Sequence, residues 1–185
     1  MRCFVAIDFP EHVKLAIGEV IRKVGEIGKG AVKWVPPANM HLTLKFLGEV
    51  QDKLVPGIQT ALASACAGHN RFSLNVRGAG FFPNARNPNI LWIGIEASPN
   101  LDGLFQDIDR HMAGLGFEPE TRRFSAHLTV GRVKNKRGIQ PVVDALTGYG
   151  NTSFGTIEVK EILLMKSVLK PSGAEYFRVG VVGLV

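Results

Sequence analysis

His41-Leu42-Thr43-Leu44 and His127-Leu128-Thr129-Val130 are two versions of one pattern, an imidazole and a hydroxyl separated by one apolar residue. They begin 127 − 41 = 86 residues apart in a chain of 185. A β-branched residue between apolar neighbours is typical of a strand, in which alternate side chains share a face. We therefore expect each histidine to lie beside its threonine on one face, while the leucines and valine enter the core. Two such pairs predict one site with two imidazoles and two hydroxyl donors.

Strand and helix signals alternate around these two stretches. Strands are expected at residues 2–8, 32–35, 40–47, 71–80, 90–95, 124–133, 154–159, 162–169 and 176–182. Helices are expected at residues 10–27, 53–67, 99–113 and 139–147. Ser98 is the predicted N-cap of the third helix, and Lys170-Pro171-Ser172-Gly173 is the predicted turn between the last two strands.

The order of elements repeats, because a strand and a proline-initiated helix precede each histidine strand. Phe4 lies 41 − 4 = 37 residues before His41, and Trp92 lies 127 − 92 = 35 residues before His127. A duplicated α+β unit explains this repeat. If a pseudo-twofold axis relates the halves, antiparallel sheets flanked by helices would bring both histidines to a central active-site cleft. We expect residues 1–185 to form a single two-lobed domain.

The composition favours an anionic partner. The net charge is +6 and the isoelectric point is about 9.6, values that suit a nucleic acid or a phosphate ester. A basic protein without such a partner has the same composition, so charge alone does not decide. Cys3 and Cys66 lack the spacing of a disulfide framework or a zinc site. Because the sequence contains neither a signal peptide nor an 18-residue apolar run, we expect a cytoplasmic protein that does not enter a membrane.

Two histidines can supply a general acid and a general base, because imidazole titrates near pH ~6.5. A phosphodiester suits this pair and the basic charge. One imidazole would deprotonate a water that attacks phosphorus, and the other would protonate the departing ribose oxygen. Thr43 and Thr129 would donate hydrogen bonds to the non-bridging oxygens. No metal and no cofactor is predicted, because no carboxylate, histidine or cysteine cluster accompanies the histidines. The residues alone identify the pair but do not say which histidine is the acid.

In extended form the two motifs read His41-Leu42-Thr43-Leu44-Lys45-Phe46-Leu47-Gly48 and Ser125-Ala126-His127-Leu128-Thr129-Val130-Gly131-Arg132-Val133. These two stretches resemble the paired motifs of the two-histidine phosphoesterase superfamily. Within it the chain is most similar to RNA 2′,3′-cyclic phosphodiesterases, also named the 2′-5′ RNA ligase family. The resemblance also includes Val32-Lys33-Trp34-Val35 and Asn39. Where many relatives have a proline before the second histidine, this chain has Ser125-Ala126.

The resemblance implies a bilobal α+β fold with a central cleft and the hydrolysis of RNA 2′,3′-cyclic phosphate ends to 2′-phosphomonoesters. It assigns His41 as proton donor and His127 as proton acceptor. The implied partner is RNA with a cyclic phosphate end, including tRNA fragments, and the expected state is a monomer.

Several flanking residues are weaker candidates for substrate contacts. Strand alternation places Lys45 on the cleft face, whereas Arg132 needs a bulge to reach that face; either could bind phosphate or be a solvated charge. Aromatic residues that could stack a base or pack in the core are Trp34, Phe46 and Phe82. Basic residues that could follow an RNA backbone are Arg122, Arg123, Lys134, Lys136 and Arg137.

Three alternative functions stay open. The same four residues would catalyse the reverse reaction, which joins RNA ends through a 2′-5′ linkage. They would equally act on a small cyclic nucleotide or an ADP-ribose cyclic phosphate. A non-catalytic RNA-end-binding module is the third, and it predicts binding without turnover.

Overall fold

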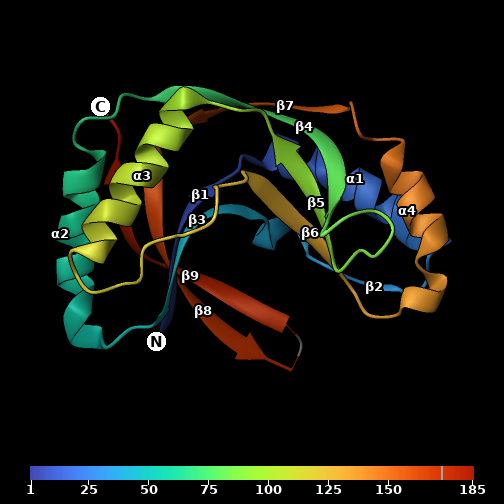
Figure 1. The fold of residues 1–185 in the computed structure, drawn as a ribbon, viewed down its shortest axis with the longest axis horizontal. Coiled ribbons are helices and arrows are strands. Elements are labelled where there is room, and N and C mark those ends of the chain that lie inside the picture. The colour runs from blue at the N-terminus through green and yellow to red at the C-terminus, as the bar shows by residue number, and fades with distance from the viewer. Residues whose placement is uncertain (172) are drawn as a thin grey trace.

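The computed structural model describes residues 1–171 and 173–185 and has an α+β architecture with two antiparallel sheets. Ser172 of the predicted hairpin turn lies outside the described residues. One sheet has the strand order β3-β1-β8-β9, and the other has the order β2-β6-β5-β4-β7. Figure 1 shows that helices lie at the two ends of the molecule, with both sheets between them.

The strands are β1 (Arg2–Asp8), β2 (Val32–Trp34), β3 (His41–Glu49), β4 (Phe72–Phe82), β5 (Ile90–Ile95), β6 (His127–Val133), β7 (Ser153–Val159), β8 (Glu161–Lys170) and β9 (Gly173–Gly183). The α-helices are α1 (Glu11–Ile27), α2 (Val55–Cys66), α3 (Pro99–Ala113) and α4 (Gln140–Thr147). The predicted elements are therefore confirmed, with shifts at their ends. The predicted N-cap is confirmed too, because Ser98 Oγ accepts a hydrogen bond from the Leu101 amide at 3.3 Å.

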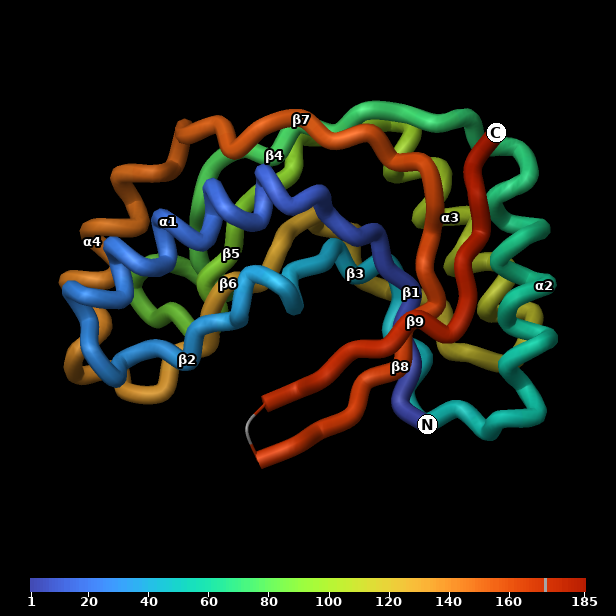
Figure 2. Tube along the Cα trace, turned by 180° about the vertical axis from the view of Figure 1, so that it is seen from behind, coloured from blue at the N-terminus to red at the C-terminus, as the bar shows by residue number. Residues whose placement is uncertain are grey.

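Each sheet has two helices on its outer face. Helices α2 and α3 pack against the sheet of β1 and β3, and helices α1 and α4 pack against the sheet of β5 and β6. The core lies in these two layers and includes Val5, Leu42, Ile93 and Leu128. Seen from behind, the two lobes form an arch from which the β8–β9 hairpin projects (Figure 2).

The pairing of the strands shows the internal repeat. Ala6 lies opposite Thr43 and Asp8 opposite His41, while Trp92 lies opposite Thr129 and Gly94 opposite His127. The offset is constant, since 92 − 6, 94 − 8 and 127 − 41 all equal 86. Phe4 is therefore equivalent to Ile90, so the stretches from Phe4 to His41 and from Trp92 to His127 do not begin at equivalent positions.

The two histidine strands share a bulge. The register of β1 with β3 shifts after Thr43, and that of β5 with β6 shifts after Thr129. Consequently Leu44 and Lys45 are both buried, as are Val130 and Gly131, and the side-chain alternation is reversed beyond this point. The residues that return to the inner sheet face are Phe46 and Arg132.

Candidate active site

His41 and His127 occupy the first positions of β3 and β6, which belong to different sheets but contact each other at the centre of the molecule. Both are on the inner face of their sheet, the face turned away from the helices. Leu42 and Leu128, their neighbours, are buried at 1% and 0% exposure. Alternation along the strand therefore directs each imidazole inward, as the sequence predicted.

A backbone carbonyl two residues earlier orients each imidazole. Nδ1 of His41 lies 2.9 Å from the Asn39 carbonyl oxygen, and Nδ1 of His127 lies 2.6 Å from that of Ser125. A carbonyl only accepts hydrogen bonds, so Nδ1 carries the proton in both rings. Nε2 is then the nitrogen that can exchange a proton with a substrate.

Aromatic side chains hold the two rings in place. His41 stacks on Phe4 with ring centroids 4.7 Å apart and meets the edge of Tyr176 at 4.9 Å. His127 meets Phe82 edge-on at 4.9 Å. Phe82 is thus part of the histidine environment. The sequence around Tyr176 contains no motif that would predict its contact with His41.

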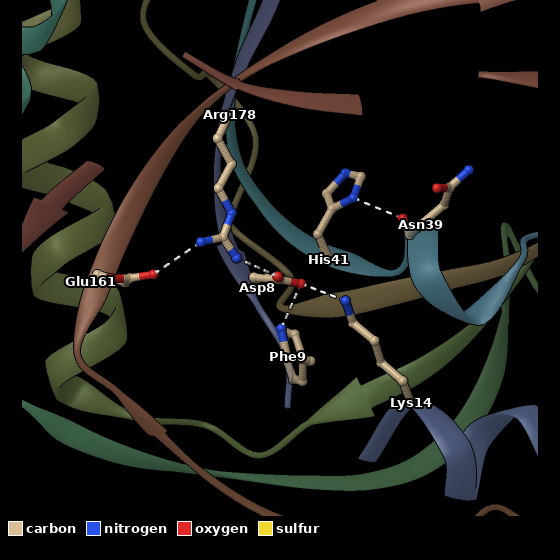
Figure 3. Close-up of polar contacts among 7 residues, drawn as sticks. All are labelled: Asp8, Phe9, Lys14, Asn39, His41, Glu161 and Arg178. Carbon is tan, nitrogen blue, oxygen red and sulfur yellow. Dashed lines mark hydrogen bonds and ion pairs between the residues drawn. The ribbon is translucent and has the colours of Figure 1, made fainter. Parts of the chain in front are cut away.

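Asp8 supplies a negative charge beside His41 (Figure 3). It accepts hydrogen bonds from Lys14 Nζ at 2.6 Å, from the Phe9 amide at 2.9 Å and from Arg178 at 3.1 Å. Burial opposes its ionisation, but these donors outweigh burial and lower the pKa of Asp8 below its usual value. Asp8 is therefore a fixed anion directly opposite His41 in the sheet.

Burial lowers the pKa of His41 from its ordinary value, whereas the Asn39 carbonyl and the Asp8 charge act in the opposite direction. Burial disfavours the charged imidazolium, so His41 is mostly neutral at pH 7 in the free protein. An anion bound beside the ring favours the imidazolium and raises the pKa again. Such an anion would therefore favour protonated His41, the form in which an imidazole can act as a general acid.

We expect His41 to titrate below its ordinary pKa in the free protein and to titrate higher once 2′-AMP is bound. The sign follows because burial penalises the charged ring and a phosphate dianion stabilises it. Two-dimensional NMR of the imidazole nitrogens across a pH series measures both values. A His41 pKa that stays unchanged on 2′-AMP binding would contradict this coupling.

The hydroxyls of Thr43 and Thr129 are half-buried, and neither forms a hydrogen bond with a residue that the structure describes. Each sits two residues from its histidine on the same sheet face. Each is therefore placed to donate to an anion bound beside its own histidine.

The predicted position of Lys45 is wrong. Its side chain is 2% exposed and forms an ion pair with Asp109 of α3 at 2.5 Å, so it does not reach the inner face. It also donates to the Glu118 carbonyl oxygen. The bulge after Thr43 caused this reversal, and strand alternation alone could not reveal it.

Arg132 does reach the inner face because the corresponding bulge follows Thr129. It is exposed and lies directly opposite Lys33 of β2. Phe46 occupies the equivalent position in the other lobe and is 66% exposed. Its ring centroid lies 6.1 Å from that of Phe4. Phe46 thus does not pack in the core, and it shares the face of His41.

The histidines line two cavities. A cavity of about 180 Å³ lies at His41, with Asn39, Tyr176 and Arg178 in its wall. A larger one of about 610 Å³ lies at His127, and Arg122 and Arg123 line it together with Trp92. The predicted basic residues therefore separate: these two arginines border the second cavity, whereas Lys134, Lys136 and Arg137 follow β6 at the far end of its sheet.

Among residues 1–171 and 173–185, no group of three or more histidine, cysteine or carboxylate side chains is arranged to hold a metal ion. No helix in that part of the chain is long and apolar enough to cross a membrane.

The chain is similar to known proteins over nearly its whole length. The family model of LigT-like phosphoesterases matches twice, at residues 7–92 and 93–176, one match for each half. The RNA 2′,3′-cyclic phosphodiesterase of Archaeoglobus fulgidus is 35% identical over 95% of this chain and 96% of its own length. That of Methanocaldococcus jannaschii is 37% identical, with the same two coverages.

Solved structures show the same fold. The crystal structure of TT0787 from Thermus thermophilus superposes with a TM-score of 0.82 at 27% identity, covering 100% of this chain and 98% of the other. E. coli LigT complexed with 3′-AMP has a TM-score of 0.77 at 24% identity, covering 99% and 97%, a likeness that concerns the fold alone. With its doubled family match and its similarity over nearly the whole length, this chain belongs to the LigT-like phosphoesterase family.

Proposed function

We propose that this protein hydrolyses 2′,3′-cyclic phosphate ends of RNA to 2′-phosphomonoesters, with His41 and His127 as an acid–base pair. The observation that carries the proposal is the matched orientation of the two imidazoles, each bound at Nδ1 by the carbonyl two residues earlier. The names of the relatives support the choice of substrate. The cytoplasmic location and the monomeric state stay predictions, as do tRNA fragments as substrates.

In this mechanism His127 Nε2 takes a proton from water, and the water oxygen forms the new bond to phosphorus. The bond from phosphorus to the ribose 3′ oxygen breaks, and His41 Nε2 delivers a proton to that oxygen. Thr43 and Thr129 donate to the non-bridging oxygens, and Arg132 adds positive charge. The protons balance, because one imidazole gains what the other loses. No metal takes part in these steps.

The test is incubation of an oligoribonucleotide that ends in a 2′,3′-cyclic phosphate, with excess EDTA present. The expected product carries a 2′-phosphate, identified by chromatography against 2′- and 3′-phosphate standards. A 3′-phosphate product would contradict the assigned bond cleavage. Activity that EDTA abolishes and divalent metal restores would contradict the proposed metal independence, and binding without turnover would favour the RNA-end-binding module.

We expect Thr43→Val and Thr129→Val each to lower kcat by roughly a hundredfold, because valine keeps the shape and removes the donor that meets the developing charge. Steady-state kinetics on the same oligoribonucleotide measures the loss. A matched control is Thr60→Val, because Thr60 lies on α2 and its hydroxyl donates to the Pro56 carbonyl of the same helix. Unchanged kcat in both active-site variants would remove the threonines from the mechanism.

A further inference from the structure

The positive charge of the protein is concentrated at one end of the sheet that carries His127. Three segments meet there: residues 28–40, 83–90 and 131–143. Backbone hydrogen bonds join them, from Lys134 and Asn135 to Ala31 and from Val133 to Asn89. Figure 1 shows β2, β6 and the loop between β4 and β5 together at this end. We call these three segments the basic end.

The three segments contain no carboxylate, and the nearest carboxylates along the chain are Glu26 and Asp144, each within two residues of a segment end. The seven cationic residues of the basic end are Lys29, Lys33, Arg86, Arg132, Lys134, Lys136 and Arg137. The rest of the chain then has 22 − 7 = 15 basic and 16 acidic residues. The basic end therefore carries a charge of +7, and the rest of the chain carries a charge of −1.

None of these seven side chains is buried, and none forms an ion pair within residues 1–171 and 173–185. Lys33 and Arg132 lie directly opposite each other on adjacent strands, an arrangement that is destabilising for like charges. Nothing in the fold requires it, because the position related to Arg132 by the repeat is Phe46. A bound anion would neutralise this pair.

The basic end is continuous with the active site. Arg132 follows Thr129 on the inner face of β6, and Lys33 extends that row to β2. Beyond this row, Lys134 and Arg137 continue along the chain to the loop after β6. A polyanion with one end at His127 would pass over these charges, whereas a cyclic mononucleotide would end before them.

We propose that the basic end binds the RNA backbone upstream of the cyclic phosphate, so that the preferred substrate is an RNA chain and not a cyclic mononucleotide. This inference rests on the proposed function and specifies its substrate class. Phosphate contacts of this kind are independent of sequence and sensitive to salt. The expected preference is thus for length, with little dependence on base identity.

The test compares two substrates, a decaribonucleotide with a 2′,3′-cyclic end and 2′,3′-cyclic AMP. The variant is the triple substitution Lys33→Gln, Lys134→Gln and Arg137→Gln. We expect its kcat/KM on the decamer to fall at least tenfold at 100 mM salt, while kcat/KM on cyclic AMP stays within twofold. The plot of log(kcat/KM) against log[salt] should become shallower by about 0.7 for each lost phosphate contact.

The matched control removes the same charge elsewhere, by Lys23→Gln, Lys53→Gln and Arg71→Gln. These three side chains are exposed and lie outside the basic end. An equal loss in both triple variants would attribute the effect to net charge and overturn the proposal. So would an equal loss on both substrates, or no loss at all. If the wild-type protein turns over neither substrate, the proposed function itself fails. The basic end is then tested by binding, with the affinity for a 3′-phosphorylated decamer measured by fluorescence anisotropy in the wild type and in both triple variants.

Discussion

Replacement of either active-site histidine by alanine is expected to lower kcat by roughly a thousandfold or more. General acid–base catalysis contributes about 10²–10⁴ in rate, and each imidazole is the group among the described residues that is placed to move its proton. The two losses should not multiply in the double variant, because the two residues act in one transition state. Single-turnover kinetics on cyclic-ended RNA measures all three variants.

The fold should survive these changes. Leu42 and Leu128 anchor the histidine strands in the core, and the imidazoles lie on the opposite face. Circular dichroism and cooperative thermal unfolding check this point. A control is His69→Ala, which removes an imidazole paired with Asp107 between α2 and α3, away from the cavities at His41 and His127. Wild-type kcat in His41→Ala or His127→Ala would exclude that residue from catalysis.

Lys45→Ala is expected to cause the largest loss of stability, lowering the free energy of unfolding by about 3–5 kcal/mol. Lys45 is almost completely buried, and its ammonium contacts both the Asp109 carboxylate of α3 and the Glu118 carbonyl in the segment after that helix. Asp109 also accepts a hydrogen bond from the Glu120 amide of the same segment. Without Lys45, the Asp109 carboxylate loses its cation in a site with little access to water.

Urea unfolding of the variant measures this change. Lys53→Ala is the control, because Lys53 is exposed and a surface substitution of this kind alters stability by at most about 0.5 kcal/mol. Asp109→Asn should recover part of the loss in the Lys45→Ala background, since it removes the uncompensated charge. A Lys45→Ala protein as stable as the control would show that the buried ion pair contributes nothing net.

Much of this molecule could be predicted from its sequence because two signals were duplicated. The His-x-Thr pattern indicated both the strands and the face on which the two histidines lie, and the repeated strand–helix order indicated the α+β unit. Proline and serine at helix starts located the helices, as Ser98 shows. Each of these signals is local, so one sequence was enough to find it.

The features that were predicted wrongly or missed depend on contacts between segments that are distant in the sequence or on backbone atoms. The bulges after Thr43 and Thr129 arise from how β3 and β6 pair with β1 and β5, and they decide that Lys45 is buried while Arg132 and Phe46 are exposed. The carbonyls of Asn39 and Ser125 orient the imidazoles through backbone atoms, which no side-chain motif reports. Tyr176 reaches His41 from the far end of the chain.

In the proposed mechanism one histidine donates a proton to the leaving oxygen while the other activates water. The most direct measurement uses a 2′,3′-cyclic phosphate in which sulfur replaces the bridging 3′ oxygen, because a thiolate leaves without needing a proton. We expect His41→Ala to hydrolyse this substrate within tenfold of the wild-type rate, while His127→Ala stays inactive. Equal inactivity of both variants, or rescue of His127→Ala in place of His41→Ala, would contradict the mechanism.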